Sequence, residues 1–357
     1  MSWFLAFAGF AALIVLHEFG HFAAAKATGM RVERFALFFP PLLFKVRRGE
    51  TEYGVGAIPL GGYVRITGMN PREEIPDEVK PRAYFRQPVW KRIVVVSAGP
   101  AMNLLVAFLI LWGLFLANGS ATATKRIDAH GLQAPAASVL RPGDRVVSVD
   151  GVRGSQEAIA TAVARHRCAG HATKGCVATT AATVTVVRAG HPLTFTIAPR
   201  YDPAVGHTRL GFTYHVQYRS VGAVAAARES VSGMWRVTKL TVSAVARIFQ
   251  PEQRKQLSSV VGASKATEQA FNHGVTDALS LLALISLSLA IINLFPFLPL
   301  DGGHIFWAVA EKVRGRPISF EVMERAGVVG FALVLMLFFI GLSNDIGRLQ
   351  GAGFPSR

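Results

Sequence analysis

The stretch WFLAFAGFAALIVLHEFGHFAAA, residues 3–25, decides the fold because it is apolar apart from one short motif. A helix of about 23 residues, rising 1.5 Å per residue, is long enough to cross the roughly 30 Å hydrocarbon layer of a membrane. The motif within it is His17-Glu18-Phe19-Gly20-His21. Ionisable side chains are rare in membrane spans and mark functional sites there. The sequence therefore predicts a membrane protein with a polar site in its first span.

The two histidines of this motif have the spacing of metal ligands. Residues four apart lie on one face of an α-helix, so His17 and His21 point the same way. Two neutral imidazoles so placed hold one Zn²⁺ ion, and the adjacent Glu18 can serve as general base for a metal-bound water. The alternative interpretation is a polar cluster at the interfacial end of a helix. A third ligand elsewhere in the chain would favour the metal site.

Composition agrees with a membrane protein. Apolar residues make up 51 % of the 357 residues and charged residues only 17 %, which leaves room for a membrane core and one modest soluble domain. The net charge of +16 comes from scattered basic residues, without a long Lys/Arg run. This pattern argues against nucleic acid as a partner, and anionic lipid explains the charge more simply.

Four segments are apolar enough to be predicted as spans: residues 3–25, 93–117, 278–300 and 326–342. The last, at about 17 residues, is at the lower limit of length. The first has neither a cationic segment before it nor a small-residue cleavage site, so we do not interpret it as a signal peptide. An even number of spans places both termini on the same side.

Positive charges beside the spans predict the orientation. The loop between the first two spans carries Lys26, Arg31, Arg34, Arg86, Lys91 and Arg92 next to its ends. Cytoplasmic loops carry such an excess of basic residues, so this loop is predicted to be cytoplasmic and both termini to face outward. The first motif then lies toward the cytoplasmic end of its span.

The candidate third ligand lies in the stretch NLFPFLPLDGGH, residues 293–304. Pro296 and Pro299 interrupt helical hydrogen bonding, and irregular backbone at membrane depth is tolerated only inside protein or beside a wet cavity. Asp301 is therefore expected to face an internal polar site. One carboxylate with two histidines leaves a fourth position for water, as in catalytic zinc sites. The alternative is that Asp301 caps a helix starting near Gly303.

Together these motifs resemble the site-2 protease family of intramembrane zinc metalloproteases. The resemblance covers nearly the whole chain and is carried by H-E-F-G-H at His17–His21, N-x-x-P-x-x-x-x-D-G-G at Asn293–Gly303, and Gly99-Pro100-Ala101-Met102-Asn103. The layout is closest to the bacterial branch with one inserted PDZ domain. Residues 258–264, SSVVGAS, look most like actinobacterial Rip-type members and depart from the commoner G-P-V-G pattern.

The resemblance implies roles for individual residues. It implies His17, His21 and Asp301 as ligands of Zn²⁺, the expected cofactor, and Glu18 as catalytic base. It also implies that Asn293 helps to hold the substrate or its oxyanion. An amide donor near a metal can do this, although Asn293 could equally be a helix-packing residue.

The predicted cytoplasmic loop contains a β-loop at residues 42–67. Residues 42–46 and 51–57 form a hairpin around a turn at 47–50, followed by a strand at 62–67. This region resembles the membrane-associated β-loop of the family. A transmembrane substrate must be unwound before cleavage, and pairing it here as an added strand would satisfy its freed N–H and C=O groups. A small sheet that merely covers the site is the equal alternative. The residues predicted to contact substrate are Tyr53, Gly54, Val55, Gly56, Gly61 and Gly62.

After the second span the composition becomes globular. Residues 134–151 resemble the core of a bacterial PDZ domain, and residues 183–187 and 193–197 alternate as strands do. We predict an extracytoplasmic α+β PDZ domain at 122–200. Such domains accept a peptide terminus at a sheet edge, and the alternative is a steric plug that binds nothing tightly.

Two further segments accompany this domain. Cys168 and Cys176 are the only cysteines, and on the oxidising side of a membrane they are expected to form a disulfide. Two neighbouring histidines make a second zinc site the lesser alternative. Residues 220–250 mix apolar and basic side chains, which predicts an amphipathic helix that lies on the membrane surface or packs on the PDZ domain. Residues 257–274 are expected to be a loop.

The complete prediction is an α-helical polytopic membrane protein with four transmembrane helices, a cytoplasmic β-hairpin region and one inserted α+β PDZ domain. Its parts are residues 1–121, 122–200, 201–275 and 276–357. It would sit in the plasma membrane, with the lipid bilayer as partner, and cut pre-trimmed single-span proteins such as anti-sigma factors or signal-peptide remnants. The alternative is a non-enzymatic PDZ scaffold or transporter subunit, which would not need Glu18.

Overall fold

The computed structural model describes residues 2–70, 73–129, 131–170, 172–173, 175–202, 206–247, 274–296, 300–316 and 318–350. The chain forms two compact units. The first, a helical unit, contains the described residues up to Ala117 and from Gly222 onward, and the second is Asn118–Val221.

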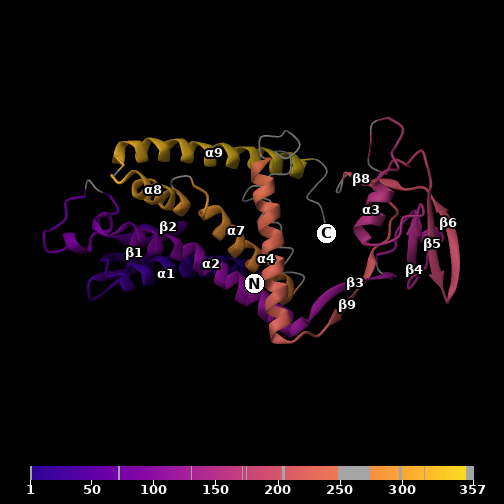
Figure 1. The fold of residues 1–357 in the computed structure, drawn as a ribbon, viewed down its shortest axis with the longest axis horizontal. Helices are drawn as coiled ribbons and strands as arrows, with labels where there is room; N and C mark the ends of the chain where they lie inside the picture. Colours follow the sequence, from indigo (N-terminus) through magenta and orange to yellow (C-terminus); the bar gives the residue numbers. More distant parts are fainter. Residues whose placement is uncertain are drawn as a thin grey trace. The chain divides into compact units, whose positions relative to one another are not determined.

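Within the described part of the chain, four helices are long and apolar enough to span a membrane (Figure 1). They are α1 (Ser2–Ala27), α2 (Val89–Asn118), α7 (Val275–Asn293) and α9 (Phe320–Gln350). The prediction of four spans is therefore confirmed, but their limits differ. The third helix ends at Asn293, before Pro296, instead of running to residue 300, because proline cannot donate the next helical hydrogen bond. The fourth is longer than the predicted 326–342.

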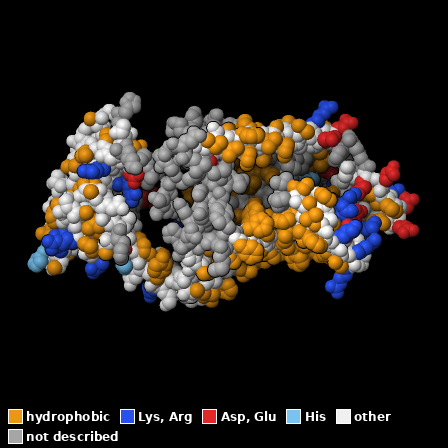
Figure 2. Space-filling view, turned by 180° about the vertical axis from the view of Figure 1, so that it is seen from behind, with side chains coloured by type: hydrophobic (Ala, Val, Ile, Leu, Met, Phe, Trp, Pro, Cys, Tyr) orange, Lys and Arg blue, Asp and Glu red, His pale blue; other side chains and the backbone are white. Residues whose placement is uncertain are grey.

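The outer surface of the helical unit is apolar. Hydrophobic side chains cover most of its visible face in Figure 2, and charged side chains gather at the end that carries the β1–β2 sheet. Phe4, Leu109, Val329 and Phe339 are between 48 % and 71 % exposed. An exposed apolar surface of this extent suits contact with lipid.

Helices α1 and α2 approach closely near the first motif. A Cβ atom on Gly20 would lie 2.3 Å from the carbonyl oxygen of Ala98, so only glycine allows this contact. Beside it, Met30, Val32 and Val95 are fully buried and join the end of α1, the β1–β2 sheet and α2 in one core. This packing fixes the motif against α2.

Helix α4 (Ala223–Ala246) is the amphipathic helix predicted within residues 220–250. It lies across α2 and α7 in Figure 1, where Met234 and Val237 pack against Ala107, Leu287 and Ile291. It therefore belongs to the helical unit; its two predicted placements, on the membrane surface or against the PDZ domain, stay predictions. Trp235 and Leu240 on its other face stay at least 60 % exposed. The predicted loop 257–274 falls outside the described residues, apart from Gly274.

The β-loop is larger than predicted. Strands β1 (Val32–Arg48) and β2 (Thr51–Ile66) pair around a turn at Gly49 and Glu50. The predicted separate strand 62–67 is the end of β2. The register is bent, so that residues 34–37 pair with both 52–55 and 62–65. Residues 52–55 pair in addition with 44–47, which places them inside the sheet.

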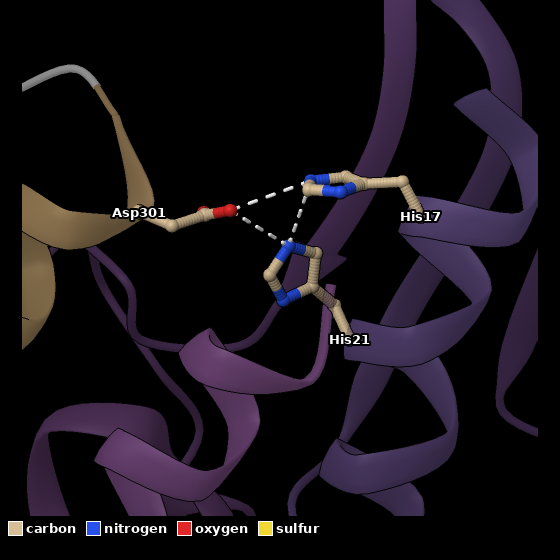
Figure 3. Close-up of side chains that lie close together, drawn as sticks. All are labelled: His17, His21 and Asp301. Atoms are coloured by element: carbon tan, nitrogen blue, oxygen red, sulfur yellow. Dashed lines mark hydrogen bonds and ion pairs between the residues drawn. The ribbon is translucent and has the colours of Figure 1, made fainter. Parts of the chain in front are cut away.

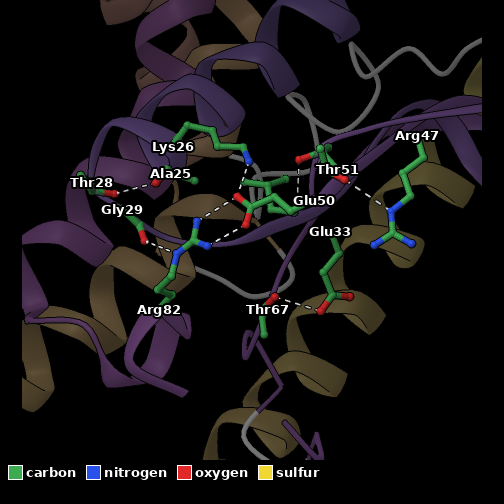
Figure 4. A network of polar contacts seen from close by, with 12 residues as sticks. Ala25, Lys26, Thr28, Gly29, Glu33, Arg47, Glu50, Thr51, Thr67 and Arg82 are labelled. Carbon is green, nitrogen blue, oxygen red and sulfur yellow. Dashed lines mark hydrogen bonds and ion pairs between the residues drawn. The ribbon is translucent and has the colours of Figure 1, made fainter. Parts of the chain in front are cut away.

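A polar network ties this sheet to the end of α1 (Figure 4). Glu50 accepts hydrogen bonds from Arg82 at 2.6 and 2.8 Å and from Lys26 at 2.5 Å. Arg82 also donates to the carbonyl of Gly29, just after α1 ends. Two 3₁₀ turns, η1 (Lys80–Arg82) and η2 (Tyr84–Arg86), then lead into α2.

The second unit is an α+β domain. Its five-stranded sheet has the order β6-β5-β4-β3-β9, and β7 and β8 form a separate pair. The strands are β3 (Ser120–Ile127), β4 (Arg145–Val149), β5 (Ala182–Arg188), β6 (His191–Ile197), β7 (Arg200–Asp202), β8 (His207–Arg209) and β9 (Tyr214–Arg219). The helix α3 (Gln156–Ala164) and the short η3 (Ala136–Ser138) complete it.

This domain extends beyond the predicted limits of 122–200. Strand β9 pairs with β3, with Ser120 opposite Arg219, so the chain enters and leaves the domain on neighbouring strands. The predicted domain ends too early because β9 pairs with β3, which lies far earlier in the chain. Cys168 and Cys176 are joined by a disulfide, with their Cα atoms 6.2 Å apart.

The Glu50 network predicts an acid-dependent stability. Hydrogen bonds from Arg82, then from Lys26, lower the pKa of Glu50 from 4.5 to about 2, although its partial burial raises it. The contribution is complete above about pH 4.5 and is lost as the pH falls toward 2. Because the carboxylate is partly exposed, Glu50→Gln should cost only about 1 kcal/mol at pH 7.

Thermal unfolding of the detergent-solubilised protein at pH 7, 4 and 3 would measure this. The difference in melting temperature between wild type and Glu50→Gln should become smaller at the lower pH values. Asp77→Asn is the control, since the Asp77 side chain is 90 % exposed and its removal should leave the melting temperature unchanged. A difference in melting temperature that becomes larger on acidification would contradict the stabilising role assigned to Glu50.

Candidate metal centre

The two histidines of the first motif meet Asp301 in one cluster (Figure 3). His17 and His21 lie one helical turn apart on α1, with their Nε2 atoms 3.3 Å from each other. Each Nε2 atom is also 3.3 Å from Oδ2 of Asp301. The three side chains are between 12 % and 20 % exposed.

Asp301 reaches this position because the backbone turns sharply after α7. The next helix, α8, runs from Asp301 to Arg314 and begins with Asp301 itself. Its start packs on the end of α7: a Cβ atom on Gly302 would lie 2.3 Å from the carbonyl oxygens of Leu294 and Phe295. The residue preceding the helix is Leu300, and no side chain caps the helix there. The carboxylate of Asp301 points instead toward the imidazoles.

The cluster fits a zinc ion. Four ligands about 2.0–2.1 Å from a tetrahedral zinc lie about 3.3–3.4 Å from one another, which matches the separations of the three atoms here. Oδ2 of Asp301 is buried and finds no hydrogen-bond donor among the described residues. A buried carboxylate oxygen without a donor is costly unless a cation compensates it. Two imidazoles and one carboxylate are also a donor set of catalytic zinc sites.

Helix α2 supports the two imidazoles from behind. Nδ1 of His21 lies 2.9 Å from the carbonyl oxygen of Val95, to which it donates. Nδ1 of His17 lies 3.1 Å from the side-chain amide of Asn103. Gly99 lies between Val95 and Asn103 on α2, and a Cβ atom there would lie 2.2 Å from His21 Nε2. The glycine thus leaves room for the ring.

A cavity of about 490 Å³ opens beside the cluster. Glu18 and Asn293 line it together with the three cluster residues, as do Gly61 and Gly62 of β2. A Cβ atom on Gly62 would lie 2.1 Å from Cγ of Glu18, so β2 passes directly over this carboxylate.

The structure does not bring the other four predicted substrate contacts, residues 53–56, to the cavity. The Tyr53 ring packs against Phe22 and Phe35. Cβ atoms on Gly54 and Gly56 would lie 2.4 and 2.1 Å from carbonyl oxygens of β1. The glycines permit a close backbone approach, but the neighbour is the chain's own strand. Residues 53–55 are paired on both edges, so they offer no edge to a substrate.

Two polar residues of the cavity lining were not predicted as site residues, namely Asn103 and His304. Asn103 is a polar side chain within a predicted apolar span, and a polar group in a span is itself a signal of function. His304 is the last residue of the stretch 293–304, which contains Asp301. Either signal was available in the sequence, but neither specifies a contact without the packing of α2 and α8 around the cluster.

Comparison with known proteins identifies the family. The model of peptidase family M50 matches residues 5–337. The chain belongs to peptidase family M50. The resemblance to site-2 proteases is therefore confirmed, although residues 258–264, on which the Rip-type likeness depended, lie outside the described residues.

Curated relatives span almost the whole chain. Zinc metalloprotease Rip1 of Mycobacterium tuberculosis is 32 % identical over 375 residues, covering 94 % of this chain and 92 % of Rip1. A putative zinc metalloprotease of Nostoc sp., all3971, is 30 % identical over 348 residues, covering 94 % and 93 %. One of Rhizobium meliloti, R01501, is 29 % identical over 366 residues, covering 95 % and 94 %. This M50 protein is therefore a membrane zinc metalloprotease with Zn²⁺ as cofactor, which favours the enzyme over a scaffold or transporter subunit.

The space left by Gly99 predicts a mutant effect. Gly99→Ala should displace His21 and lower zinc affinity at least tenfold, the scale seen when groups supporting a ligand are changed. Gly113→Ala is the matched control, because Gly113 lies in the same helix with nothing within 4 Å of its Cβ position. Alanine stabilises a helix equally at both sites. Zinc content after chelator competition measures the difference, and equal retention by both variants would remove Gly99 from the site.

Proposed function

We propose that this enzyme hydrolyses peptide bonds within or near transmembrane segments at the cluster of His17, His21 and Asp301. The observation that carries the proposal is the triangle of three ligand atoms, each 3.3 Å from the other two. Its members come from α1 and from the start of α8, on opposite sides of the cavity. A ligand set divided between these elements couples zinc binding to the packing of the helical unit.

Bound zinc supplies a Lewis acid that polarises the peptide carbonyl and lowers the pKa of a water. The residues of the chain do the remaining work. A carboxylate oxygen of Glu18 takes a proton from the attacking water and passes it to the nitrogen of the leaving peptide. Asn293 lines the cavity, and in this proposal its side chain donates a hydrogen bond to the carbonyl oxygen as negative charge develops on it.

The substrate binds along the end of β2. Residues 62–65 pair with β1 on one side only in the register of the described residues, whereas residues 52–55 pair on both. Gly62 packs against Glu18, and Gly62 and Val64 both line the cavity, which places the open edge beside it. A transmembrane helix must unwind before cleavage, and pairing with this edge satisfies its freed N–H and C=O groups. Gly61 and Gly62 keep their predicted role as substrate contacts, whereas Tyr53–Gly56 have no such role in this proposal.

The proposed topology places the β1–β2 sheet and the cluster toward the cytoplasm and the second unit outside. Basic residues beside α1 and α2 support it, as does a disulfide, which persists in oxidising surroundings. We assign the second unit as the PDZ domain, on its strand pattern and the Asp150–Gly151 turn after β4. There it selects single-span substrates that another protease has already trimmed, including anti-sigma factors or signal-peptide remnants.

Separating metal binding from proton transfer tests the chemistry. Glu18→Gln should abolish cleavage of a single-span model substrate in proteoliposomes, by more than about a thousandfold, yet keep zinc at close to one ion per chain. Asp301→Ala and His17→Ala should lose both. Zinc is counted by mass spectrometry and cleavage by gel. Full zinc retention by Asp301→Ala, or cleavage by Glu18→Gln at the wild-type rate, would contradict the assignment.

A further inference from the structure

Asn103 is a polar residue that the proposed chemistry does not use. Its side chain is fully buried in α2, behind His17. Its Nδ2 atom lies 3.1 Å from His17 Nδ1, and its Oδ1 atom has no partner among the residues that the structure describes. The hydroxyl of Ser286 on α7 donates to its backbone carbonyl at 2.9 Å. Helix α7 therefore holds the backbone of Asn103, while its side-chain amide lies beside a ligand histidine.

The orientation of this amide determines which nitrogen of His17 carries the proton. If Nδ2 donates, then Nδ1 accepts and the proton of the neutral ring is on Nε2. Nε2 is the atom that faces Asp301 and His21. A protonated Nε2 has no lone pair, so it cannot bind a metal. The donor orientation of Asn103 and a zinc ligand at His17 Nε2 exclude each other.

We propose that Asn103 presents Oδ1 to His17 in the zinc-bound enzyme, accepting a hydrogen bond from Nδ1–H. This proposal rests on the assignment of His17 as a ligand. The amide oxygen and nitrogen have nearly the same size, and which is which is assigned from hydrogen bonding. Turning the amide over needs no change in packing. Either orientation leaves one amide atom without a partner among the described residues, so the requirement of the metal decides.

His21 supports this inference, because its partner can only accept. The carbonyl of Val95 holds the proton on Nδ1 and leaves Nε2 free to bind. Val95 and Asn103 are eight residues, about two turns, apart on α2, and the two histidines are one turn apart on α1. Helix α2 thus provides one acceptor for each ring. Ligand histidines commonly donate their second N–H to such an acceptor, which fixes the tautomer and raises ligand basicity. Asn103 is a positioning residue that acts through His17.

The test compares Asn103→Asp with Asn103→Leu. Aspartate keeps an acceptor and removes the donor, whereas leucine of similar size removes both. Zinc affinity of the full-length protein in detergent is measured by chelator competition. We expect Asn103→Leu to bind zinc about 10- to 100-fold more weakly and Asn103→Asp to stay within about threefold of wild type, a rescue that a packing role would not give.

Two controls separate other causes. Ser286→Ala removes the bond to the Asn103 backbone but leaves the amide in place, so it should keep wild-type zinc affinity, and a melting curve shows that each variant is folded. The proposal is overturned if Asn103→Asp loses as much affinity as Asn103→Leu, or if folded Asn103→Leu binds zinc like wild type. Full zinc affinity in His17→Ala would instead overturn the proposed ligand set, whatever Asn103 does.

Discussion

Holding a carboxylate and two imidazoles 3.3 Å apart inside an apolar helical unit is unfavourable unless a cation and further hydrogen bonds compensate it. Moving a charged group away from water costs several kcal/mol, and an unpaired one is more costly still. Much of the helical unit can be understood as a response to this constraint. Glycines let the helices approach closely, and α2 gives the imidazole rings their hydrogen-bond partners. The end of α7 and the start of α8 at Asp301 bring in the carboxylate.

The same constraint explains why α2 is more than a membrane anchor. It touches α1 at Gly20, leaves room for the His21 ring at Gly99, and accepts from that ring through Val95. Its contacts with α4 and α7 through Ala107 then bind the site to the rest of the helical unit. The position of the imidazoles therefore depends on helix–helix packing as much as on the motif in α1.

The sequence was sufficient for the features that depend on local chemistry. Four apolar runs predicted four spans, and the spacing of His17 and His21 predicted that they share a helix face. Asp301 could be linked to them because prolines and glycines in a span indicate an internal site. Features that depend on distant pairing could not be predicted. The bent register of β1 and β2 places residues 52–55 inside the sheet, and β9 extends the second unit; no local pattern encodes either.

Zinc K-edge X-ray absorption on the purified protein tests the central claim most directly, because it reports the atoms that surround the metal. The account predicts a first shell of nitrogen and oxygen at about 2.0–2.1 Å, with scattering from two imidazole rings and no sulfur. A shell with sulfur at about 2.3 Å would place the metal at Cys168 and Cys176, and a shell without imidazole scattering would exclude His17 and His21. Either result would contradict the account.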